Sequence, residues 1–94
     1  MVDSLVYPLV PGGTVVVPAR SGVSRYTIRI FRDTNGGAAG PARVRNSLSQ
    51  ALSREWTAAD FPDPGDEVAA GDFLADGIDV FLSAGLRGTV AVTP

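Results

Sequence analysis

The chain has 94 residues, of which 45% are hydrophobic and 19% are charged, and its formal net charge at pH 7 is −2. This size and balance predict one globular domain with a single core. The sequence contains no cysteine and no histidine, and all eight of its basic residues are arginine. These absences exclude disulfides, zinc sites, Ser-His-Asp or Cys-His catalysis, lysine Schiff bases and P-loop nucleotide binding.

The first thirteen residues, MVDSLVYPLVPGG, are mostly apolar but are interrupted by Pro8 and Pro11. Because proline donates no ladder hydrogen bond, residues 1–13 are expected to form an extended arm or an edge strand ahead of a single β domain at residues 14–94. Asp3 stands where a signal peptide carries basic residues, and no apolar run approaches the ~18 residues of a membrane helix. We therefore expect neither a signal peptide nor a transmembrane segment, and a location in the cytoplasm or in a virion.

Short β-branched runs separated by glycine or proline make up much of the remaining chain. Ser24–Arg32 is the clearest run, with Tyr26, Ile28 and Ile30 alternating with polar residues. The pattern predicts a mainly β fold, a small antiparallel β-sandwich or barrel of five to seven short strands. The expected core residues are Val15, Val17, Tyr26, Ile28, Ile30, Leu48, Leu52, Trp56, Phe73, Ile78, Val80, Leu82, Val90 and Val92.

Residues 43–56 fit two patterns. Val44, Leu48, Leu52 and Trp56 lie at helical spacing, and Ser47 followed by a glutamine three residues later resembles a capping box. Alternate residues of the same segment also fit one face of a strand. We favour a short helix near residues 47–57, with a strand as the alternative.

The segment Asp60–Glu67, DFPDPGDE, is an acidic and proline-rich turn. Its carboxylates, on Asp60, Asp63, Asp66 and Glu67, are the kind of ligand that Ca²⁺ uses, but the EF-hand pattern is absent. A solvated turn is the simpler interpretation. We therefore expect no cofactor and no metal, and a domain this small offers no deep cleft around a catalytic pair of carboxylates.

Charge is divided unevenly along the chain. Residues 20–54 hold seven arginines against Asp33, a net charge of +6, whereas residues 55–94 hold eight acids against Arg87, a net charge of −7. The two halves either pair within one fold or meet head to tail between copies, because heterologous contacts of this kind build rings. Nucleic-acid binding through Arg25 and Arg29 is the weakest interpretation, since the overall balance is acidic.

These features favour a non-enzymatic assembly module that resembles, in type, the decoration or cement proteins of tailed bacteriophages. The resemblance implies protein partners, namely copies of the chain itself or a capsid lattice, a homo-oligomeric state, and neither nucleic acid nor membrane as a partner. A phage-encoded inhibitor of a host enzyme and a carbohydrate-binding β-sandwich are the alternatives. The candidate interaction residues are Arg25, Arg29, Arg32, Asp60, Asp63, Asp66, Glu67 and Tyr7.

Overall fold

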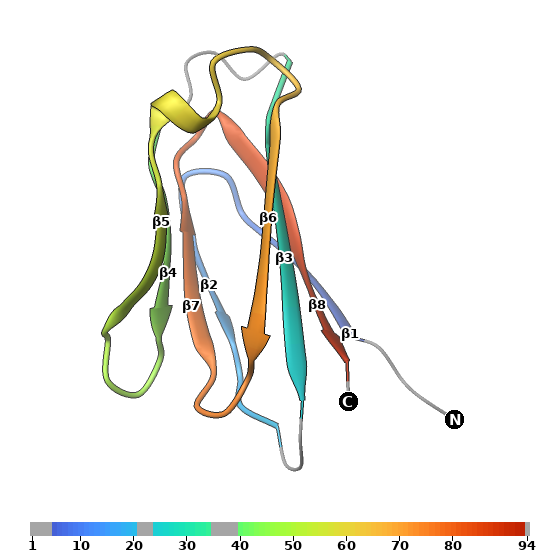
Figure 1. Ribbon diagram of the computed structural model, residues 1–94, viewed down its shortest axis with the longest axis vertical. Coiled ribbons are helices and arrows are strands. Elements are labelled where there is room, and N and C mark those ends of the chain that lie inside the picture. Colours follow the sequence, from blue (N-terminus) through green and yellow to red (C-terminus); the bar gives the residue numbers. More distant parts are fainter. Residues whose placement is uncertain (1–4, 21–23, 35–39, 94) are drawn as a thin grey trace.

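The computed structural model describes residues 5–20, 24–34 and 40–93 as a β-sandwich of two four-stranded antiparallel sheets (Figure 1). The prediction of a small antiparallel sandwich is confirmed, with eight strands instead of five to seven. The strands are β1 Leu5–Pro8, β2 Thr14–Val17, β3 Arg25–Arg32, β4 Ala42–Asn46, β5 Leu52–Trp56, β6 Glu67–Phe73, β7 Ile78–Leu82 and β8 Leu86–Thr93.

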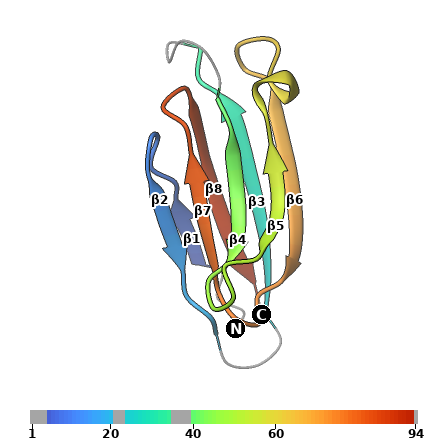
Figure 2. The same ribbon diagram turned by 90° about the vertical axis from the view of Figure 1, so that its left-hand side faces the viewer.

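The first sheet has the strand order β1-β8-β3-β6 and the second has the order β2-β7-β4-β5 (Figure 2). The chain crosses from the first sheet to the second at a turn of four residues, Val10–Gly13. The Gly13 N–H donates a 3.1 Å hydrogen bond to the Val10 carbonyl, and Gly12 has a φ of 74°. Proline in the second position and glycine in the third are what a type II turn requires. As a result β1 and β2 lie on the same side of the sandwich, and β5 and β6 lie on the opposite side (Figure 2).

Alternation along the strands places one apolar face of each sheet in a shared core. In β3, for example, Tyr26, Ile28 and Ile30 are buried and the residues between them are exposed. Most of the expected core is buried, but Leu48, Leu52 and Phe73 are not, with 79%, 48% and 56% of their surface exposed. Core residues that the pattern did not predict are Leu9, Ala42, Val44, Phe61, Leu74 and Leu86.

The expected helix near residues 47–57 is wrong, because this segment forms a turn and strand β5. The Asn46 Oδ1 accepts hydrogen bonds from the N–H groups of Leu48 and Ser49, both at 2.9 Å, which closes a turn after β4. Gln50 then takes a φ of 62°, which no helix allows. The Ser47 hydroxyl and the Gln50 amide, which suggested a capping box, both donate to the Asp79 carboxylate, at 2.6 and 2.8 Å.

The one helical segment among the described residues is a 3-10 turn, η1 Ala58–Asp60, next to the acidic loop. Its first turn is closed by the Thr57 N–H, which donates to Asp60 Oδ2 at 2.8 Å. Across the described ranges, no helix has the length and apolar character needed to span a bilayer.

Candidate interaction surfaces

Arg25 and Arg29 of β3 lie on the outer face of the first sheet, beside β6. Arg29 Nη2 donates to Glu67 Oε1 at 2.8 Å, so these two candidate residues form an ion pair within the chain. The hydrogen bond to Glu67 and the charge of that carboxylate raise the pKa of Arg29. Both side chains remain largely exposed. The pair is therefore a surface feature that a partner can reach.

Arg25 occupies the other end of the same face. Its guanidinium carbon lies 4.7 Å from the ring centroid of Phe73, which is the residue opposite it on β6. A guanidinium at this distance is attracted to the face of the ring. This contact gives the exposed Phe73 side chain a neighbour within the chain, although the sequence pattern had placed that residue in the core.

Arg32, the last residue of β3, binds the acidic loop that precedes β6 at the end of the sandwich. The Arg32 guanidinium donates to the carbonyls of Phe61 and Pro62 at 3.1 and 3.0 Å, and the Arg32 carbonyl accepts from the Gly65 N–H at 2.8 Å. The Asp63 N–H donates to Asp66 Oδ2 at 2.9 Å. Arg32 and two of the predicted acids, Asp60 and Asp66, thus hold the loop in shape.

The basic and acidic halves of the sequence meet inside one chain. Three ion pairs among residues 5–20, 24–34 and 40–93 each join a residue of one half to a residue of the other. They are Arg29–Glu67, Arg43–Glu55 at 2.7 Å, and Arg87–Asp33. Antiparallel neighbours β3 and β6, and β4 and β5, bring these partners together. The uneven charge along the sequence is therefore partly neutralised by the fold.

Two further predictions concern Tyr7 and metal binding. Tyr7 lies on β1, which strand β8 separates from the arginines of β3, and is half-buried against the core. The fold thus brings Arg29 and Glu67 together but leaves Tyr7 apart from them. Within the part of the chain that the structure describes, no group of three or more acidic residues is arranged to hold a metal ion.

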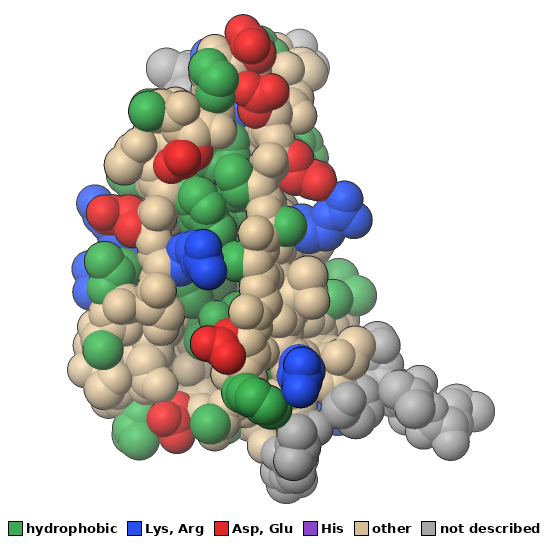
Figure 3. Space-filling view, in the orientation of Figure 1, with side chains coloured by type: hydrophobic (Ala, Val, Ile, Leu, Met, Phe, Trp, Pro, Cys, Tyr) green, Lys and Arg blue, Asp and Glu red, His purple; other side chains and the backbone are tan. Residues whose placement is uncertain are grey.

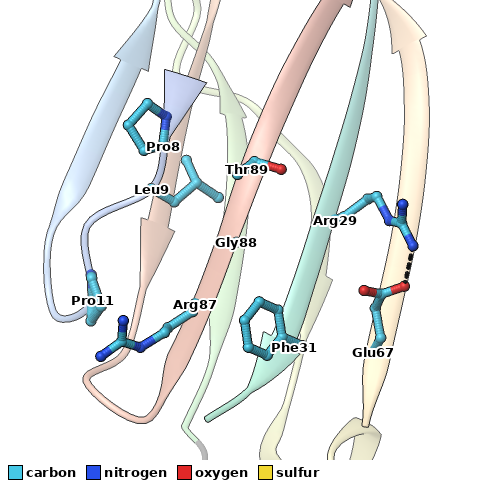
Figure 4. Close-up of a pocket in the computed structure, with 9 residues that line it drawn as sticks. All are labelled: Pro8, Leu9, Pro11, Arg29, Phe31, Glu67, Arg87, Gly88 and Thr89. Carbon is cyan, nitrogen blue, oxygen red and sulfur yellow. Dashed lines mark hydrogen bonds and ion pairs between the residues drawn. The ribbon is translucent and has the colours of Figure 1, made fainter. Parts of the chain in front are cut away.

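A shallow hollow of about 530 Å³ lies on the outer face of the first sheet, toward the start of β8 (Figure 4). Phe31 projects between Arg87 on one side and the Arg29–Glu67 pair on the other, and Pro8 and Pro11 close the side next to β1 (Figure 4). The hollow therefore mixes apolar walls with both signs of charge. It has no concentrated set of reactive groups.

The side of the sandwich formed by edges β5 and β6, which we name the charged flank, carries charges on its inner positions. Arg54 is opposite the buried Val44, and its guanidinium carbon lies 5.9 Å from the Trp56 ring centroid. Asp72 is opposite the buried Tyr26. Burial raises the pKa of the Tyr26 hydroxyl, Asp72 raises it further, and Arg54 opposes that rise. Figure 3 shows acidic and basic side chains spread over this flank around the apolar residues between its two edges.

The opposite side, formed by edges β1 and β2 and the turn between them, we name the apolar flank. Residues 4–19 include no charged residue. Val6, Val10 and Val16 expose 62%, 54% and 59% of their surface there. Leu5 pairs with the buried Val92 and so faces inward, yet 41% of its surface is exposed. The sequence analysis did not predict this surface. The run of uncharged residues at 4–19 is the signal that could have indicated it.

Comparisons with known proteins identify a similar fold but no family. No family model matches the chain, and no curated protein matches it. Among solved structures, the fold is similar to that of a chain from the endospore appendages of Bacillus, described as a novel family of disulfide-linked pili. The two chains are 11% identical with a TM-score of 0.53, and the match covers 99% of this chain and 86% of the other. At this identity the likeness shows a common β-sandwich fold.

Proposed function

We propose that this chain is a non-enzymatic structural subunit that associates with copies of itself through the apolar flank. The observation that carries the proposal is the exposure of Leu5, Val6, Val10 and Val16 on one side of the sandwich without a charged residue among them. Val6 faces out of the first sheet and Val16 faces out of the second, so these apolar side chains extend around the edge of the sandwich. Large exposed apolar surfaces on soluble proteins often mark sites of association. The charged flank, in contrast, has Arg54 and Asp72 at positions that a partner would have to desolvate.

The similar fold of a pilus chain supports an assembly role. That chain comes from appendages described as disulfide-linked, whereas the 94 residues of this chain contain no cysteine. Contacts made by these residues therefore include no disulfide. An alternative form of the proposal is docking onto a preformed capsid lattice, with the apolar flank bound to a different protein.

Sedimentation and light scattering of the wild type over a wide concentration range test self-association directly. Contacts made by apolar surface persist in high salt and strengthen in sulfate, whereas assembly through exposed ion pairs weakens as salt screens the charges. We expect the first behaviour. A wild type that stays monomeric at every concentration and salt condition contradicts self-association and leaves the lattice-docking form to be tested.

Val16→Lys provides the matching variant, with Leu52→Lys as its control. The two residues lie in one row across the second sheet, at its two edges. In that row Val16 is opposite Asp79, Asp79 is opposite Arg45, and Arg45 is opposite Leu52. Both side chains are about half exposed. We expect Val16→Lys to shift the oligomer toward monomer and Leu52→Lys to leave it unchanged. Equal effects of the two variants would remove the case for the apolar flank.

A further inference from the structure

The peptide groups of β2 alternate between its partner strand and the open edge. In an antiparallel pair, residues that exchange both hydrogen bonds recur at every second position. The Leu82 N–H donates to the Gly13 carbonyl at 3.1 Å, and the register continues with Val15 opposite Val80 and Val17 opposite Ile78. Thr14 and Val16 therefore direct their N–H and C=O groups away from β7, toward the open edge.

The other edge strand of the apolar flank, β1, offers fewer free hydrogen-bonding groups to a new strand. The Leu9 N–H donates to the Gly88 carbonyl at 2.9 Å, so the same alternation directs the peptide groups of Val6 and Pro8 outward from β1. Pro8 has no N–H to donate. Among the described outward positions of β1, only Val6 has both groups.

The edge strand β6 of the charged flank has free peptide groups but carries charges beside them. The Leu74 N–H donates to the Ser24 carbonyl at 2.9 Å, which directs Ala69 and Gly71 of β6 outward. A strand added there would lie against Asp72 and near Arg54, and inward-pointing charges of this kind discourage edge pairing. Compared with β1 and β6, β2 therefore combines free donors and acceptors with a strand that has no charged residue of its own.

We propose that two copies pair through β2, antiparallel and about a two-fold axis at Val15, with Thr14 opposite the partner's Val16. This inference rests on the proposed function and names the strand contact through which two copies associate. Thr14 and Val16 then each exchange both peptide hydrogen bonds with the partner subunit, which satisfies all the free groups of the strand. The contact is isologous, the arrangement most common in homodimers.

Pro18 after β2 and the turn before it select this register. Moving the pairing so that Val16 lies opposite the partner's Val16 places Thr14 opposite the partner's Pro18, which has no N–H. Moving it the other way places Val16 opposite the partner's Gly12, which belongs to the turn at a φ of 74°. The paired second sheets then form one sheet of order β5-β4-β7-β2-β2-β7-β4-β5, and the apolar flanks meet without a charge between them.

Engineered cysteines test the register, because the chain has none of its own. At the two-fold axis, Val15 of each copy forms a non-hydrogen-bonded pair with Cα atoms about 4.5 Å apart, which falls within the range of a disulfide. We expect Val15→Cys to form a covalent dimer under mild oxidation. An equimolar mixture of Thr14→Cys and Val16→Cys should cross-link as a heterodimer, with Cα atoms about 5.5 Å apart. Each of these two variants alone should cross-link far less.

Ala69→Cys, on the β6 edge, is the control, and a thermal melt verifies that each variant is folded. The mixed pair keeps the test valid if Val15→Cys disturbs the half-buried site. Cross-linking of Ala69→Cys but not of the β2 variants would overturn the inference, as would efficient homodimers of Val16→Cys without those of Val15→Cys. Oligomers that form without any β2 cross-link would overturn the pairing and leave the proposed function intact. A wild type that remains monomeric in all conditions would overturn both the pairing and the self-association on which it rests.

Discussion

Arg29 and Glu67 connect the basic strand β3 to the acidic strand β6 by a contact of 2.8 Å between Nη2 and Oε1. The residues that the sequence suggested for contacts between copies thus already interact within one copy. Arg29→Glu places two carboxylates next to each other, so we expect a lower melting midpoint and an unchanged molar mass. The double exchange Arg29→Glu with Glu67→Arg should recover most of the midpoint. A loss of oligomer in the single variant without a change in its melt would instead place this pair in an interface.

Asp79 provides a prediction for acid pH. Hydrogen bonds from Ser47 and then Gln50 hold the pKa of its carboxyl below the usual range. Because the folded pKa lies below that of the unfolded chain, about 4, the contribution of Asp79 to stability is complete above that pH. It is lost as the pH falls through the folded value. We expect Asp79→Asn to reduce the difference in melting midpoint between neutral pH and about pH 3.

Ser47→Ala with Gln50→Ala is the companion of that variant, because it removes both donors and keeps the carboxylate. This double variant should reduce the same difference in melting midpoint between neutral pH and about pH 3. If this difference is unchanged in both variants, other groups determine the acid sensitivity of the fold.

Core burial predicts contrasting effects for two aliphatic residues. Ile28 is fully buried, so Ile28→Ala should lower the free energy of unfolding by about 2–5 kcal/mol in denaturant melts. Leu48, with 79% of its surface exposed, is the control, and Leu48→Ala should change that free energy by less than about 0.5 kcal/mol. A large loss at Leu48 would indicate that this side chain is covered in solution, for example by a partner.

Gly77 separates backbone conformation from steric crowding. It has a φ of 80°, and a Cβ there would lie 2.9 Å from the Val17 carbonyl oxygen and 3.0 Å from the Ala19 nitrogen. Gly77→Ala should therefore lower the free energy of unfolding by more than about 1 kcal/mol. Gly65 has a φ of 89° with no atom within 4 Å of an added Cβ. Gly65→Ala should cost clearly less, and equal losses would assign the whole effect to the backbone.

The strand pattern was predictable where alternation was strict. Tyr26, Ile28 and Ile30 have the faces that period-two spacing assigns, because both sheets bury one face against the other. The segment after β4 was not predictable in this way. Its apparent capping residues, Ser47 and Gln50, bond to Asp79, a residue about thirty positions away. Local spacing holds no information about such a partner.

The candidate site was predicted less well than the fold. The charge pattern of the sequence indicated Arg29 and Glu67, which the antiparallel pairing of β3 and β6 brings together. The apolar flank is recognisable only when β1 and β2 are known to lie at edges on the same side. The spacing of apolar residues such as Val16 does not show whether another strand follows beside them.

The pairing of β1 with β8 determines how the subunit resists force. Leu5 is opposite Val92, so the outer ends of these two neighbouring strands lie at the same end of the sandwich (Figure 1). Hydrogen bonds in an antiparallel pair run perpendicular to the strands. A load applied through these two ends would therefore break the bonds one after another, like a zipper, instead of shearing them together.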